Sequence, residues 1–239
     1  MKIDFHTHYS KEHFEALCKK AKSLGLDGLV MEGIPYQESF SANGLTIFPA
    51  QEVLWTAPLE IYNQFLTEDR DIESKVFKTE IFKGKALVLM PENKLTPQEK
   101  SLDFLILRVS EERGVIISLH DEKNIFVPSS ITDKKLNYPF HATRIRPFNG
   151  YDIGLLMPII RTEGIAVAGS NATTSDELTY GKGFTEFELR IKTKEQLIQS
   201  IRNKSPTKLY VHGEPNIRIE DTAGPKKVVF DPNLLKGFS

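Results

Sequence analysis

Short apolar runs and amphipathic stretches alternate along the first part of the chain. Residues 3–8 and residues 26–31 have the length and apolar content of strands. Between them, apolar side chains recur at helical spacing over residues 14–24, with Ser10 as the predicted N-cap and Gly25 as the stop. Strand, helix and strand joined by short connections predict a βαβ unit, which implies a parallel sheet.

The rest of the chain continues this mixture of strand-like and helix-like segments. Lys83-Gly84-Lys85 lies between two strand-like runs, which predicts a hairpin turn. Apolar runs predict strands at residues 45–50, 76–82, 86–90, 115–119, 142–146, 165–168, 186–191 and 209–212. Helical spacing predicts helices at residues 96–109, opened by Thr96-Pro97, and at residues 153–160 and 193–201.

Length and composition limit the class of protein, but they do not change the predicted helices and strands. With 239 residues and no repeat or clear linker, we expect a single domain over residues 1–239, with a short irregular segment from about residue 213. The net charge of −1 gives no global field for nucleic acid or membrane, and no apolar run approaches the roughly 20 residues of a membrane span. A single cysteine, Cys18, and an N-terminus without a signal-peptide pattern favour a cytoplasmic location.

Residue types that bind metals recur where the predicted strands end. His6 and His8 are two positions apart, so they point to the same side of the first strand. Each strand-end residue alone has an ordinary explanation, a solvated glutamate or a structural histidine, but the joint pattern is much less expected by chance. The residues at strand ends are His6, His8, Glu32, Glu52, His120 and Asn171.

The carboxyl ends of strands in an α/β barrel or doubly wound sheet open on one face, where sites are built. Mixed imidazole and carboxylate ligands suit Zn²⁺, Mn²⁺ or Fe²⁺. Such ions make hydroxide available near neutral pH, which is hydrolase chemistry.

Two arginines and a further histidine are weaker candidates. Arg144 and Arg146 share one face of a predicted strand, where they either bind a phosphate or form a solvated, ion-paired face. His141 precedes that strand and is either a proton donor or a structural residue.

Several of these segments resemble, in order, the motifs of the PHP (polymerase and histidinol phosphatase) domain family. Residues 4–10 resemble its opening Asp-x-His-x-His-x-Ser motif, which is the most specific of the matches. The later matches gain weight from their order, and the resemblance covers about residues 2–203. The other matching segments are residues 25–32, 49–52, 113–120, 148–150, 168–172 and 180–187.

The resemblance implies a distorted (β/α)7 TIM-like barrel that hydrolyses phosphoesters with up to three metal ions at its C-terminal face. Three positions depart from the family pattern. Gly33 stands where a histidine is usual, Asn171 replaces a metal-binding aspartate, and Thr173 lies near the place of a histidine. An amide oxygen can coordinate a metal but carries no negative charge. We therefore expect one or two divalent ions. The ligands carried over from the family are His6, His8, Glu52 and His120, with Glu32 and Asn171 as weaker ones.

The leading hypothesis is a metal-dependent phosphoesterase that hydrolyses a small phosphomonoester or a nucleotide or oligonucleotide phosphoester through metal-activated water. His6, His8, Glu52 and His120 would act through the metal, and the partner would be a phosphorylated small molecule or a nucleic-acid end. The alternative is a non-catalytic PHP-like barrel that binds a ligand, a partner or RNA. A metal-dependent amidohydrolase is a third hypothesis, although the lysine or late aspartate used by such enzymes is not apparent at the expected strand ends.

Overall fold

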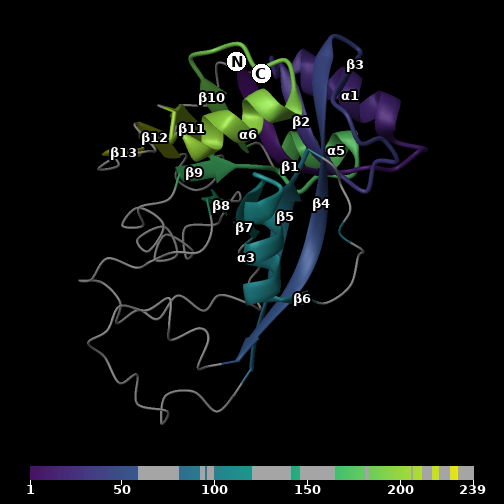
Figure 1. Cartoon of the computed structure of the whole chain (residues 1–239). Coiled ribbons are helices and arrows are strands. Elements are labelled where there is room, and N and C mark those ends of the chain that lie inside the picture. The colour runs from purple at the N-terminus through teal and green to yellow at the C-terminus, as the bar shows by residue number, and fades with distance from the viewer. Residues whose placement is uncertain are drawn as a thin grey trace.

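One continuous sheet organises the part of the chain that the structure describes. This computed structural model describes residues 1–58, 81–91, 95, 100–119, 141–145, 165–180, 183–205, 207–211, 217–220 and 227–230. The sheet has the strand order β13-β12-β11-β10-β1-β2-β4-β5-β7-β8-β9, with β3 and β6 paired to β4 (Figure 1). The strands are β1 (Lys2–His8), β2 (Gly28–Glu32), β3 (Phe40–Ala42), β4 (Leu45–Pro58), β5 (Ile81–Leu89), β6 (Lys100–Ser101), β7 (Val115–Leu119), β8 (Ala142–Ile145), β9 (Ile165–Ala168), β10 (Gly183–Phe187), β11 (Thr207–Val211), β12 (Ile217–Glu220) and β13 (Lys227–Phe230). The helices of the described residues are α1 (Phe14–Ser23), α3 (Leu102–Glu111), α5 (Ser175–Tyr180) and α6 (Lys194–Arg202).

The N-terminal βαβ unit forms as the hydrophobic pattern predicts. β1 and β2 are parallel neighbours, and β2 pairs in parallel with β4. Between β1 and β2, α1 buries Leu17, Cys18 and Ala21, which lie on one helical stripe. The predicted helix start was early, because residues 11–13 form a turn in which the Ser10 carbonyl accepts a hydrogen bond from the Phe14 amide.

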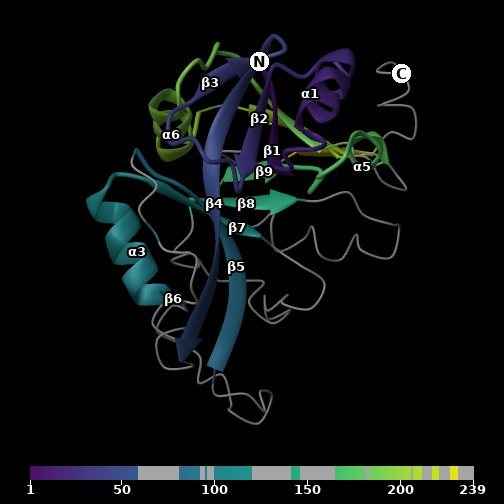
Figure 2. The same cartoon turned by 90° about the vertical axis from the view of Figure 1, so that its right-hand side faces the viewer.

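A long antiparallel ribbon interrupts the parallel sheet after β4. β4 and β5 pair antiparallel over eight residue pairs, and β5 pairs antiparallel with β7 (Figures 1 and 2). The predicted hairpin at residues 83–85 is wrong, because these residues lie in the middle of β5. A Cβ at Gly84 would lie 2.3 Å from the Trp55 ring, so this glycine makes room for an indole and not for a turn.

The other half of the sheet curls back toward β1. β7, β8 and β9 are parallel, and the chain leaving β9 reaches the end of β1. There the Asn171 amide donates to the His6 carbonyl at 2.7 Å, and the His8 amide donates to the Ala172 carbonyl at 2.8 Å. The strands from β1 to β9 therefore form a curled half-barrel. The α/β class is therefore confirmed, but in the described residues the strands are of mixed direction and form part of a barrel, not the complete distorted (β/α)7 TIM-like barrel that was expected.

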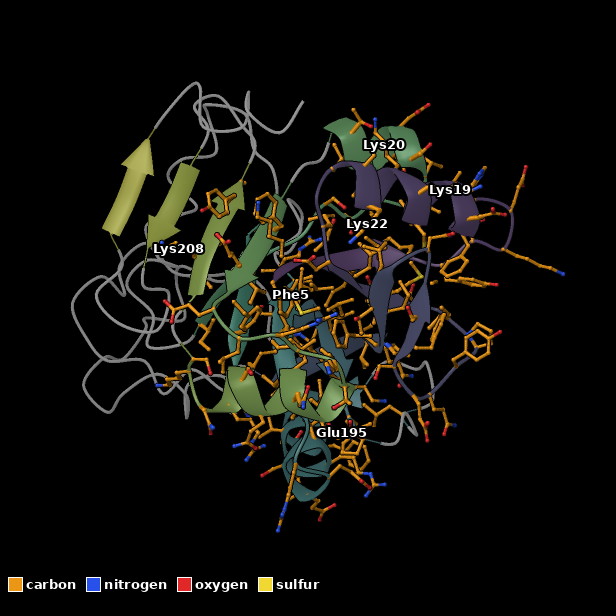
Figure 3. All side chains as sticks on the ribbon, turned by 90° about the horizontal axis from the view of Figure 1, so that it is seen from above. Phe5, Lys19, Lys20, Lys22, Glu195 and Lys208 are labelled. Carbon is orange, nitrogen blue, oxygen red and sulfur yellow. The ribbon has the colours of Figure 1, made fainter. Side chains whose placement is uncertain are left out.

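Apolar side chains fill both sides of the curled sheet. The interior cluster includes Phe5, Phe48 and Val167, and α6 covers it with Leu197 and Ile201. Seen from above, Phe5 lies in the middle of the molecule while Lys19, Lys20 and Lys22 of α1 lie toward the outside (Figure 3). A second cluster lies on the other side of the ribbon, where Leu105 and Val109 of α3 pack near Trp55.

The remaining sequence predictions have mixed outcomes. The helix from residue 193 is confirmed, and the Thr193 hydroxyl oxygen accepts a hydrogen bond from the Gln196 amide. The helix predicted from residue 96 was too long, because Lys100–Ser101 is the short strand β6 and α3 begins at Leu102. The segment predicted to be irregular from about residue 213 contains β12 and β13, while the helix predicted at residues 153–160 lies outside the described residues. None of the helices described is both long and apolar enough to span a membrane.

Candidate metal centre

The two histidines of β1 lie side by side at the carboxyl end of the strand. The centroids of the His6 and His8 rings are 4.6 Å apart, and the ring planes are inclined by 55°. His6 is buried, whereas the side chain of His8 is 24% exposed. The pair therefore has an inner member within the sheet and an outer member open to solvent.

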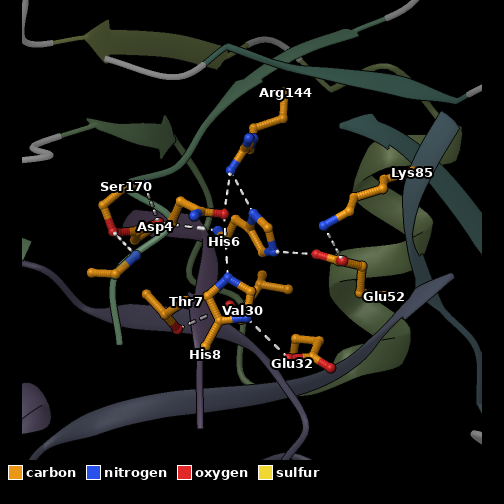
Figure 4. A network of polar contacts seen from close by, with 12 residues as sticks. Asp4, His6, Thr7, His8, Val30, Glu32, Glu52, Lys85, Arg144 and Ser170 are labelled. Carbon is orange, nitrogen blue, oxygen red and sulfur yellow. Dashed lines mark hydrogen bonds and ion pairs between the residues drawn. The ribbon is translucent and has the colours of Figure 1, made fainter. Parts of the chain in front are cut away.

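Glu52 of β4 completes a group of three side chains (Figure 4). Each of His6, His8 and Glu52 offers one potential ligand atom, and these atoms all lie within 4.8 Å of one another. His6 Nε2 lies 3.4 Å from a Glu52 carboxylate oxygen. His6 Nε2 is buried and has no hydrogen-bond partner among the described residues. Two imidazoles and one carboxylate are a donor set that suits Zn²⁺, Mn²⁺ or Fe²⁺, so these residues fit a divalent metal.

Glu32 lies behind His8 and not among the three grouped side chains. The pairing of β1 with β2 places His8 opposite Glu32, and the carboxylate lies 3.0 Å from His8 Nδ1. This hydrogen bond is the main reason why the pKa of His8 is raised above its usual value. A carboxylate on Nδ1 also leaves Nε2 facing the site, as in carboxylate–histidine–metal arrangements.

Asn171 reaches the site from the segment that follows β9. Its backbone has a left-handed φ of 63°, which asparagine tolerates better than most residues. The side-chain oxygen lies 3.2 Å from His8 Nε2 and accepts a hydrogen bond from Arg144 Nη1 at 3.2 Å. The structure therefore brings Asn171 to the histidine pair, as its place at a strand end suggested.

Asp4 holds the end of β9 against β1 from beneath the histidines. Its Oδ1 accepts hydrogen bonds from the amides of His6 at 3.0 Å and Ser170 at 2.9 Å. Complete burial raises the pKa of Asp4 to about 6, although these hydrogen bonds and the nearby Arg144 oppose the rise. Asp4 is thus a structural anchor that fixes the backbone of a candidate ligand.

Arg144 is a deeply buried cation at the site. It is 2% exposed, and its Nη1 donates a hydrogen bond to His6 Nδ1 at 2.5 Å. The pKa of His6 is lowered to about 4, mainly by burial and further by the charge of the Arg144 guanidinium group. This ring is therefore neutral near pH 7. The predicted strand face thus carries an arginine directed at the histidine pair. Its partner in that prediction, Arg146, lies outside the described residues.

Lys85 is the residue that the sequence pattern missed. Its ammonium lies 2.8 Å from Glu52, and the pKa of Glu52 is lowered to about 2 by His6 and then by Lys85, against the opposing effect of burial. Lys85 is the last residue of the predicted turn Lys83-Gly84-Lys85, so only the antiparallel ribbon of β4 and β5 reveals that it reaches the site.

Two further candidates were His120 and His141. His120 directly follows β7 and lies outside the described residues, so its role as a ligand stays a prediction. His141 precedes β8, and its Nδ1 accepts a hydrogen bond from the Ile116 amide at 3.2 Å. This contact agrees with the structural interpretation of His141.

Comparison with known proteins gives a shared fold at low sequence identity. No protein-family model matches the chain, and no curated protein sequence matches it. The structure is similar to that of the lesion-specific endonuclease PfuEndoQ from Pyrococcus furiosus, with a TM-score of 0.53 and 14% identity over 98% of this chain and 60% of that chain. A structure of endonuclease Q in complex with a 27-mer duplex substrate with an abasic lesion at the active site matches with a TM-score of 0.48 and 12% identity, over 84% of this chain and 56% of that chain. The chain therefore spans about three fifths of the length of the endonucleases it resembles.

Proposed function

We propose that this protein is a metal-dependent phosphoesterase of the PHP type. The observation that carries the proposal is the convergence of His6, His8 and Glu52, whose potential ligand atoms lie within 4.8 Å of one another. His6 and His8 come from the carboxyl end of β1, whereas Glu52 lies within β4, which continues past the strand end that was expected at residue 50. The order of PHP-like motifs in the sequence supports the same assignment.

One divalent ion would be held by His6, His8 and Glu52, with His120 and Asn171 as further ligands predicted from the sequence. When bound, it supplies an activated water near neutral pH and neutralises charge on phosphoryl oxygens. The protein's own contribution is orientation. Glu32 holds His8 through Nδ1 at 3.0 Å, and Lys85 holds Glu52 through an ion pair at 2.8 Å.

We favour a phosphodiester of a nucleic acid as the substrate over a small phosphomonoester. The similarity in fold to a lesion-specific endonuclease supports this choice. With a net charge of −1, the chain has no overall attraction for a polyanion, so recognition would depend on local cations at the site.

The test combines metal analysis with hydrolysis assays on the purified protein. We expect bound Zn²⁺, Mn²⁺ or Fe²⁺ and cleavage of oligonucleotides, with or without an abasic site, when Mn²⁺ or Zn²⁺ is supplied. Small phosphomonoesters should be hydrolysed more slowly. His6→Ala should remove both metal and activity, whereas His13→Ala, a histidine replacement at the start of α1, should leave both intact. A metal-free protein without turnover, in which His6→Ala alters only stability, would refute the proposal.

The contact between Arg144 and His6 is the one observation that favours a non-catalytic alternative. A protein cation already sits against the inner histidine, at 2.5 Å from Nδ1. If this contact persists in solution with every metal tried, the barrel is a binding module. RNA or DNA affinity that falls steeply with salt and is independent of metal would then support that alternative.

A further inference from the structure

Arg144 contacts the candidate metal centre from inside the sheet. Nη1 lies 2.5 Å from His6 Nδ1 and 3.2 Å from Asn171 Oδ1, and that same oxygen lies 3.2 Å from His8 Nε2 (Figure 4). A histidine nitrogen and an amide oxygen are groups that also bind divalent metals. The guanidinium group therefore contacts, in His6 and Asn171, two groups that could bind a metal cation.

The contact also determines where the proton of the neutral His6 ring lies. A guanidinium group has only donors, so His6 Nδ1 must accept the hydrogen bond with its lone pair. The single proton of the neutral ring then lies on Nε2, the nitrogen that faces Glu52 at 3.4 Å. A metal ion binds an imidazole nitrogen through a lone pair, which this tautomer does not offer at Nε2.

Both possible modes of metal ligation by His6 therefore conflict with the contact. Ligation through Nδ1 would place the ion where Arg144 Nη1 lies, and ligation through Nε2 would require the proton to move to Nδ1, against an arginine donor. Resting on the proposed function, we infer that Arg144 is an internal cation that competes with the metal for His6. The ion binds fully only when the Arg144–His6 hydrogen bond is broken. This makes Arg144 a residue that sets metal affinity, and not one that contacts the substrate, since only 2% of it is exposed.

The charges around the site agree with this role. Asn171 brings no negative charge to the position next to Arg144, where its side-chain oxygen accepts a hydrogen bond from Nη1. Asp4 is buried nearby, and the hydrogen bonds that it accepts from the His6 and Ser170 amides stabilise its charged form. The competing cation thus shares two partners, His6 and Asn171, with the proposed metal ion.

The test compares Zn²⁺ affinity in Arg144→Gln with that in Arg202→Gln by calorimetry. Arg202 is a matched arginine that donates to the Gly114 carbonyl, away from the histidine pair. We expect Arg144→Gln to bind Zn²⁺ about tenfold more tightly than wild type, because the competing state is removed, and Arg202→Gln to bind as wild type does. Equal or weaker binding by Arg144→Gln would overturn the inference while leaving the proposed function intact. Failure of wild type and both variants to bind metal would overturn both.

A second measurement needs no variant and so does not depend on how Arg144→Gln folds. Nitrogen-15 spectra of the histidine rings distinguish protonated, unprotonated and metal-bound nitrogens. In metal-free wild type, His6 should have an unprotonated Nδ1 and a protonated Nε2. At full Zn²⁺ occupancy, Nδ1 should become protonated or metal-bound. An Nδ1 signal that stays unchanged at full occupancy would show that Arg144 remains in place, and would overturn the inference.

Discussion

Asp4 and Ser170 are hydrogen-bonded neighbours, although 166 positions separate them in the sequence. The Ser170 amide donates to Asp4 Oδ1 at 2.9 Å, and the same oxygen accepts from the His6 amide. One buried carboxylate thereby fixes the backbone on either side of the candidate metal centre. The curl of the sheet and the geometry of the site depend on the same side chain.

Asp4→Ala should therefore destabilise the protein by about 2–4 kcal/mol, because two buried amides lose a charged acceptor. Urea denaturation followed by circular dichroism measures this change. Asp4→Asn keeps one oxygen acceptor and should be clearly less harmful. If the alanine variant were as stable as wild type, the anchoring role of Asp4 would be wrong.

Glu32→Gln tests whether the carboxylate behind His8 supports metal binding. A glutamine in place of the carboxylate weakens the hydrogen bond on Nδ1, which should lower Zn²⁺ affinity by about 10–100-fold. Calorimetric titration provides the measurement. Glu15→Gln is a matched control, because Glu15 is an exposed residue of α1 that pairs with Lys19. A reduction in affinity confined to Glu32→Gln would support the arrangement, and equal affinities would contradict it.

The candidate centre could be predicted from the sequence where it depends on strand periodicity. His6 and His8 share a face because they are two residues apart. Glu32 lies near them because β2 runs parallel to β1, and Glu52 lies near them because it directly continues the part of β4 that is parallel to β2. The period of a strand is a local property that apolar runs reveal, and the order strand, helix, strand indicates the parallel pairing of β1 with β2.

The cations at the site could not be predicted in the same way. Arg144 meets His6 across 138 positions, and this contact exists only because the sheet curls. Lys85 reaches Glu52 only because β5 runs antiparallel to β4, whereas Lys83-Gly84-Lys85 has the composition of a turn. Strand direction and curl are decided by packing between distant segments, which a single sequence does not display.

Gly84→Ala examines the packing that replaced the predicted turn. The added Cβ would lie 2.3 Å from the Trp55 ring, so either the indole or the strand must move. We expect a loss of about 1–3 kcal/mol in the free energy of unfolding. Trp55→Leu should make the alanine nearly harmless, and a double-mutant cycle by urea denaturation measures this coupling. Additive effects of the two substitutions would show that the indole does not require this glycine.

His141 should make stability depend on pH in the mildly acidic range. The pKa of His141 is lowered from the ordinary value of 6.5 to about 4. Burial is the main cause, and the charge of Arg202 is a lesser one. Its Nδ1 accepts from the Ile116 amide at 3.2 Å, an arrangement that protonation of Nδ1 would break. In the range between these pKa values the unfolded chain binds a proton that the folded chain does not, so stability is full above pH 6.5 and declines as the pH falls toward 4. The difference corresponds to at most about 3 kcal/mol.

Urea denaturation at pH 7.5 and at pH 5 measures the contribution of His141. The loss of stability on acidification should be smaller in His141→Gln than in wild type, even though this variant starts less stable at pH 7.5. His13→Gln is the matched control, and its acid dependence should equal that of wild type. The same acid dependence in His141→Gln and wild type would mean that other groups account for it, and that His141 is not held neutral by its place beside Ile116.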